Sequence, residues 1–228
     1  MTNSVSNPCA IVIPKKILRK LLLTLSLVVA SVSPASAKPE NVTDAEMRLL
    51  PQYCPDTQGF KYGYKESPRH RHWENLMGEG FWHMHHYCWA LINFNRSMKA
   101  GTPADRRRSM WEDILKDYLY VIKNTPADFI MLPEVMTRAG EVEILLKRPN
   151  NANALFQRAR ELKPDYWPAY SRWAEFLIKH GKRKEALAIV ESGLEHAPQA
   201  KVLLEQKKIL GGKTPNAPDS SQSAPAAP

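Results

Sequence analysis

Apolar residues recur at intervals of three and four along much of the chain, a spacing that is typical of amphipathic helices. Four segments carry it most clearly: 110–124, 151–163, 167–181 and 184–197. Proline follows three of them, where it would end a helix, at Pro126, Pro164 and Pro198. No segment alternates apolar and polar residues cleanly enough for a strand. The pattern therefore predicts an all-α fold.

The regions that flank these helices have different patterns. Residues 38–79 are rich in turn-forming and aromatic residues, apart from a capping-box sequence at 43–46 that predicts a short helix. We interpret 38–79 as an irregular N-terminal wrap over a helical domain at 80–210. Residues 211–228 contain no large apolar side chain and are predicted to be a disordered tail.

The first 37 residues have the order of a secretory signal peptide. Basic residues within 15–20 precede the apolar run 21–32, and small residues follow at Ala35 and Ala37. We therefore expect cleavage after Ala37 and a periplasmic protein. The alternative, an uncleaved signal that anchors the chain, is the only membrane contact that the sequence indicates.

Charge and cysteine content are consistent with export. Loss of 1–37 removes four basic and no acidic residues, which lowers the formal charge from +9 to +5. This small excess does not favour nucleic-acid binding. Cys9 leaves with the signal, and the remaining pair predicts a Cys54–Cys88 disulfide that attaches the wrap to the helical domain.

The helices also form an internal repeat. A small residue lies in the first helix of each of three pairs, at Ala90, Gly140 and Ala174. In the second helix, residues at matching spacing precede a closing proline. The middle repeat has Ala152, Phe156, Ala159 and Pro164, and the last repeat has Ala186, Val190, Gly193 and Pro198. This arrangement resembles the tetratricopeptide repeat (TPR), a helical hairpin of 34 residues.

The resemblance implies a TPR-like helical-hairpin solenoid of about three repeats. The middle repeat (133–166) and the last (167–200) follow the family pattern, whereas the first, near 80–127, needs a 12-residue insertion that we expect as a loop over 95–108. A capping helix is predicted at 200–212, with its apolar residues on or near one face at Val202, Leu203, Ile209 and Leu210. A generic helical bundle is the alternative.

No motif indicates catalysis, since GxSxG, P-loop and HExxH sequences are all missing, so we expect neither an enzyme nor a cofactor. The segment "GFWHMHHYCW" (80–89) offers a second hypothesis, a periplasmic metal- or haem-handling protein that uses His83, His85 and His86. The repeat register places His86 at a packing position, where we expect a core histidine. No structural role is expected for His83 or His85, so these two keep the metal hypothesis open.

In TPR proteins, partner peptides usually lie in the concave groove that the first helices form. The resemblance thus implies a protein–protein interaction module, either a free adaptor or a subunit of an envelope complex, and it leaves the oligomeric state open. By register, the residues expected to face a protein or peptide partner are Met84, Tyr87, Leu91, Phe94, Glu134, Thr137, Arg138, Glu141, Ser171, Arg172, Glu175 and Lys179.

Overall fold

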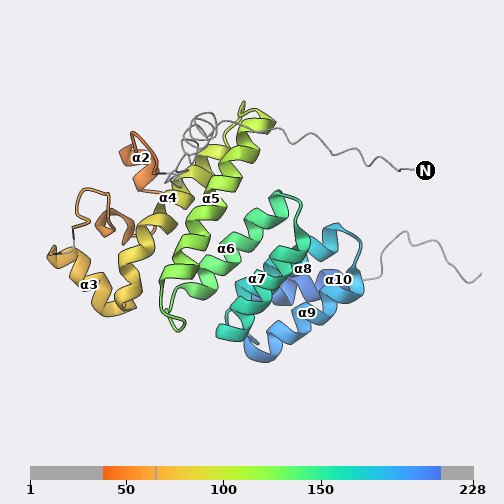
Figure 1. Cartoon of the computed structure of the whole chain (residues 1–228). Helices are drawn as coiled ribbons and strands as arrows, with labels where there is room; N and C mark the ends of the chain where they lie inside the picture. The colour runs from red at the N-terminus through yellow and green to blue at the C-terminus, as the bar shows by residue number, and fades with distance from the viewer. Residues whose placement is uncertain (1–37, 65, 212–228) are drawn as a thin grey trace, which may run out of the picture. The chain divides into compact units, whose positions relative to one another are not determined.

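The computed structural model describes residues 38–64 and 66–211, which belong to one compact unit (Figure 1). The predicted signal peptide at 1–37 and the predicted tail at 212–228 lie outside them, and Gly211 closes the last helix. Within the described ranges the structure is helical and has no strand, and none of its helices is long and apolar enough to cross a membrane. The elements are α2 (Asp44–Met47), η1 (Cys54–Asp56), α3 (Pro68–Met77), η2 (Glu79–His83), α4 (Met84–Ser97), α5 (Ala104–Asn124), α6 (Leu132–Leu145), α7 (Pro149–Leu162), α8 (Trp167–Lys179), α9 (Arg183–His196) and α10 (Lys201–Gly211).

Three helical hairpins, α4–α5, α6–α7 and α8–α9, make up most of this unit. Their first helices pack closely on their second helices because Ala90, Gly140 and Ala174 carry little or no side chain. A Cβ atom added at Gly140 would lie only 2.9 Å from the ring of Phe156 on α7, which is itself fully buried. The predicted all-α, TPR-like hairpin solenoid is therefore confirmed.

Neighbouring hairpins stack through a second small position. A Cβ atom added at Gly193 on α9 would lie 2.8 Å from Leu203 of α10 and 2.9 Å from Tyr170 of α8. Glycine at this position lets α10 seat against the last hairpin, and the burial of Leu203 and Leu210 makes α10 a capping helix. Of the four residues predicted for the apolar face, Leu203 and Leu210 are buried as expected, whereas Val202 and Ile209 are exposed.

The connection between α4 and α5 is shorter than predicted. The expected loop at 95–108 is wrong, because α5 already begins at Ala104 and the basic run 105–108 lies in its first turns. Arg107 fixes this end of the hairpin, since its guanidinium donates to the carbonyl oxygens of Ser97 and Thr102, each at 3.1 Å. The additional residues of the first repeat therefore lie largely in α5, which has 21 residues where α7 has 14.

The N-terminal wrap is more regular than predicted. The capping box at Thr43 and Glu46 is confirmed as the start of α2. Residues 38–79 are not wholly irregular, however, because they also include the ten-residue helix α3. The predicted disulfide is present, with the Sγ atoms of Cys54 and Cys88 2.06 Å apart, and it joins η1 in the wrap to α4.

Candidate functional site

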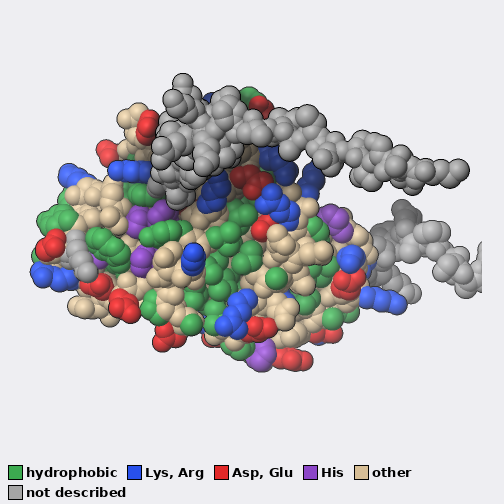
Figure 2. Space-filling view, viewed as in Figure 1, with side chains coloured by type: hydrophobic (Ala, Val, Ile, Leu, Met, Phe, Trp, Pro, Cys, Tyr) green, Lys and Arg blue, Asp and Glu red, His purple; other side chains and the backbone are tan. Residues whose placement is uncertain are grey.

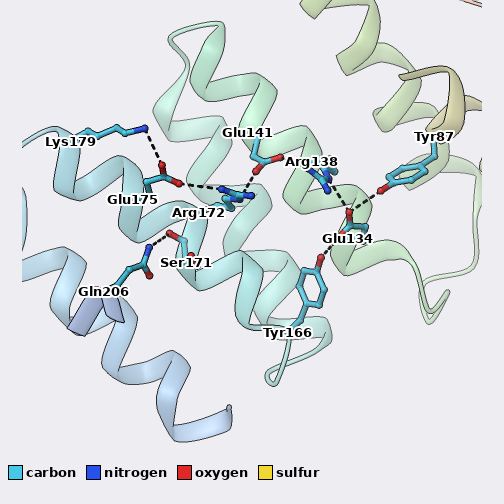
Figure 3. Close-up of polar contacts among 10 residues, drawn as sticks. All are labelled: Tyr87, Glu134, Arg138, Glu141, Tyr166, Ser171, Arg172, Glu175, Lys179 and Gln206. Carbon is cyan, nitrogen blue, oxygen red and sulfur yellow. Dashed lines mark hydrogen bonds and ion pairs between the residues drawn. The ribbon is translucent and has the colours of Figure 1, made fainter. Parts of the chain in front are cut away.

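A line of ion pairs crosses the first helices of the second and third hairpins (Figure 3). On α6, Arg138 lies 2.9 Å from Glu134 and 3.3 Å from Glu141, and on α8 Glu175 lies 3.3 Å from Arg172 and 3.1 Å from Lys179. These spacings of three and four residues place side chains on one helical face. We call these six residues the ion-pair network.

One contact joins the two helices of the network. Nε of Arg172 on α8 lies 2.7 Å from a carboxylate oxygen of Glu141 on α6. The charges then alternate in sign from Glu134 to Lys179, so each side chain has a partner of opposite charge. The network thereby orders the facing surfaces of α6 and α8.

Glu134 is the most heavily bonded carboxylate of the network. Besides Arg138, it accepts hydrogen bonds from the hydroxyl of Tyr87 on α4, at 2.8 Å, and from the hydroxyl of Tyr166 just before α8. One side chain therefore connects three successive hairpins. Tyr166 could not be predicted from the helical repeat pattern, because it lies between two helices.

The surroundings shift the pKa values of the two network glutamates on α6 in opposite directions. Burial acts to raise the pKa of Glu134, but the charge of Arg138 and the hydrogen bonds from Tyr166, Tyr87 and Arg138 outweigh it, so the pKa is lowered. For Glu141, burial outweighs the charges of Arg138 and Arg172, so the pKa is raised. Glu134 is therefore held as the anion.

We expect the Glu134→Gln variant to show how this anion stabilises the fold. A lowered pKa contributes stability that is present above the ordinary glutamate pKa, about 4.3, and is lost as the pH falls through the folded-state value. The free energy of unfolding of the wild type should therefore exceed that of Glu134→Gln most at pH 7, with a difference that shrinks below about pH 4.3. Urea titrations of both proteins from pH 3 to 7 measure this, and a difference that does not change with pH would contradict it.

Several residues predicted to face a partner do not lie at the surface. Met84, Tyr87, Thr137 and Ser171 are buried, so the prediction that they are exposed is wrong. Tyr87 packs against Tyr118, with ring centroids 5.8 Å apart, and its hydroxyl is used by Glu134. The repeat register assigns residues to positions on a helix but does not show how deeply each side chain lies.

The remaining predicted residues form a graded surface. Leu91 and Phe94 are half-buried against the core. In the network, the two glutamates on α6 are the least exposed side chains, Glu134 at 24% and Glu141 at 21%, and Lys179 on α8 is the most exposed at 69%. The residues open enough to contact a partner are therefore Arg138 on α6 and three charged residues on α8: Arg172, Glu175 and Lys179.

The capping helix adds a contact beside this surface. The side-chain amide of Gln206 on α10 donates to the carbonyl oxygen of Ser171 on α8, at 3.1 Å (Figure 3). This bond was not predicted, because the spacing of residues 200–212 does not show which neighbouring backbone a polar side chain reaches. It places α10 next to the network, beside α8.

The histidines of 80–89 are engaged in packing. Figure 2 shows histidine side chains, in purple, close together at the part of the surface where Figure 1 has α4. Nδ1 of His86 lies 2.6 Å from Oδ1 of Asp117, and its ring lies 3.8 Å from that of Tyr120, in agreement with the predicted packing position. His85, for which no structural role was expected, is buried with Nδ1 2.9 Å from the carbonyl oxygen of Trp82. Burial lowers the pKa of His85 to about 4, so this imidazole is neutral at pH 7.

The metal hypothesis needs a cluster of ligands. Among residues 38–64 and 66–211, no three His, Cys, Asp or Glu side chains come together in a way that could hold a metal ion. Structural metal sites ordinarily use four protein ligands and catalytic ones three. The described part of the chain thus provides no such set around His83, His85 and His86.

Comparison with known proteins agrees with the arrangement of the helices. Residues 144–206 match the model of the tetratricopeptide repeat family, from the end of α6 to the middle of α10. No curated protein matches the chain.

Proposed function

We propose that this chain, which carries tetratricopeptide repeats over residues 144–206, is a periplasmic protein–protein interaction module without catalytic activity of its own. Repeats of this family generally mediate contacts between proteins. We further propose that a peptide or protein partner lies along the first helices of the hairpins, across the ion-pair network. Cleavage of residues 1–37 after Ala37 would deliver the module to the periplasm.

The ion-pair network is the observation that carries this proposal. Its open members on α8 are held by neighbours, since Arg172 contacts both Glu141 and Glu175, and Lys179 contacts Glu175. Side chains that are already ordered lose less conformational entropy when a partner binds. Charged groups of both signs also give such a surface selectivity for a partner with a complementary charge pattern.

Replacing two cations of the network should weaken partner binding while the fold is kept. We expect Arg172→Gln/Lys179→Gln to reduce partner cross-linking about tenfold, since lost charge–charge contacts at an interface commonly cost this much or more. Cross-linking in cells, followed by mass spectrometry of the purified protein, measures it. Recovery from the periplasmic fraction with Lys38 as the first residue tests the proposed compartment.

Arg158→Gln/Lys184→Gln is the matched control for this experiment. It removes the same charge from exposed side chains of the second helices α7 and α9, away from the network. We expect this control to cross-link as the wild type does. If Arg172→Gln/Lys179→Gln and the wild type give the same cross-linked partners in the same amounts, binding across the network is wrong.

A further inference from the structure

A basic cavity lies between the start of the described chain and the first hairpin, away from the ion-pair network. Its volume is about 580 Å³. Four separate segments each contribute one cation: Lys38 from the wrap, Arg96 from α4, Lys99 from the α4–α5 connection and Arg106 from α5. Among the described residues, Glu40 is the one carboxylate in the lining. The cavity therefore has an excess of positive charge.

Most of this charge is not neutralised by ion pairs. Arg96 is paired, since it contacts Glu46 at 2.7 and 2.9 Å and donates to the carbonyl oxygen of Glu40 at 3.0 Å. The ammonium of Lys99 lies 3.7 Å from the same Glu46. Within 38–64 and 66–211, neither Lys38 nor Arg106 has a carboxylate at ion-pair distance. Lys38 and Arg106 are therefore left to attract an anion, and Lys99 is only partly neutralised.

The α4–α5 connection forms one side of the cavity. Gly101 has a φ of +82°, which is a left-handed conformation, and a Cβ atom added there would meet nothing within 4 Å. Arg107 fixes both ends of the connection, because its guanidinium donates hydrogen bonds to the carbonyl oxygens of Ser97 and Thr102. Lys99, the lining cation of this connection, is therefore carried by a fixed turn.

We propose that this cavity binds a phosphate group. Several cations that converge from different segments suit an anion with more than one charge and several acceptor oxygens. A single carboxylate would satisfy fewer of them. The phosphate could belong to a lipid headgroup or to a soluble phosphate ester, and the chemistry recognised by Lys38, Lys99 and Arg106 is the same in both cases.

The test compares the full chain with its Lys99→Gln/Arg106→Gln variant. Calorimetric titration with inorganic phosphate at constant ionic strength detects a soluble source. Co-sedimentation with phosphatidylglycerol vesicles, against phosphatidylcholine vesicles, detects an anionic headgroup. In at least one of these two assays the wild type should bind, and the variant should bind about tenfold more weakly because two charge-assisted contacts are lost.

The same control as above, Arg158→Gln/Lys184→Gln, separates a site from general attraction to a basic protein. It removes an equal charge and should bind as the wild type does. If the wild type binds inorganic phosphate and the cavity variant does not, the source is a soluble phosphate. If the wild type binds only the vesicles and the cavity variant loses that binding, the source is a lipid headgroup. The proposal is overturned if the wild type binds in neither assay, or if the cavity variant and the control lose affinity equally. Thermal unfolding of the variant checks that its fold is intact.

Discussion

Replacement of Cys54 and Cys88 by alanine is expected to lower the free energy of unfolding by about 3–4 kcal/mol. The two residues are 34 apart in sequence, and a cross-link that closes a loop of this size removes conformational freedom from the unfolded chain. Both cysteines are fully buried, so the alanines also leave a small void. Urea unfolding of the oxidised wild type and of Cys54→Ala/Cys88→Ala measures the difference.

The same experiment shows what the disulfide holds in place. We expect the wrap to be released first in the variant, and hydrogen exchange at α3 to rise before exchange at α6 or α8. Thiol titration of the unfolded wild type without reductant should detect neither Cys54 nor Cys88. Detection of both thiols, or equal stability of variant and wild type, would show that the bond does not support the fold.

The Glu134→Ala substitution should destabilise the protein by about 3 kcal/mol, because it removes the acceptor of three donors at once. Arg138 would keep only Glu141 as a partner, and the hydroxyls of Tyr87 and Tyr166 would lose theirs. Since Tyr87 is buried, water cannot readily replace the missing acceptor. Chemical denaturation at pH 7 gives the change directly.

An exposed glutamate provides the comparison for Glu134→Ala. Glu161 also accepts from two side chains, Gln157 and Arg158, but it lies at the surface of α7. We expect Glu161→Ala to change the stability by less than about 0.5 kcal/mol, as is usual for exposed ion pairs. Equal losses for the two variants would mean that the contacts of Glu134 with three hairpins add nothing to those of an ordinary surface pair.

The hairpins could be predicted from sequence because their packing depends on residues at regular spacing. Gly140 against Phe156, and Gly193 against Tyr170, are contacts between residues within one repeat. The disulfide could also be predicted, because only two cysteines remain once the signal is set aside. Both predictions depend only on the spacing and the number of particular residues along the sequence.

The features that were missed depend on contacts between distant segments. Of the residues of α3, only His70 is buried, so the helix has no apolar period to reveal it. It is held instead by Asp56, whose side chain accepts from Arg69 at 2.6 Å and from Trp73 at 2.9 Å. The burial of Met84 and Tyr87 has a similar origin, because they share one core cluster with residues of the wrap such as Tyr53.

The start of α5 shows a different limit. Pro103 and the charged run 105–108 were interpreted as loop signals, yet proline is well tolerated where a helix begins, and arginine is a good helix former. Local sequence supports both structures here. The hydrogen bonds of Arg107 and of Trp111, whose indole nitrogen lies 3.1 Å from Oγ of Ser97, favour the helix.

The contact between Gly193 and Leu203 has a consequence for how the molecule could change in length. The surface of α9 that receives α10 is the one on which a further hairpin would have to stack, so α10 occupies the position of a first helix without its second. A duplication of about 34 residues placed before α10 would find a compatible surface on both sides. The number of hairpins, and with it the length of the molecule, can therefore evolve without redesign of any single hairpin.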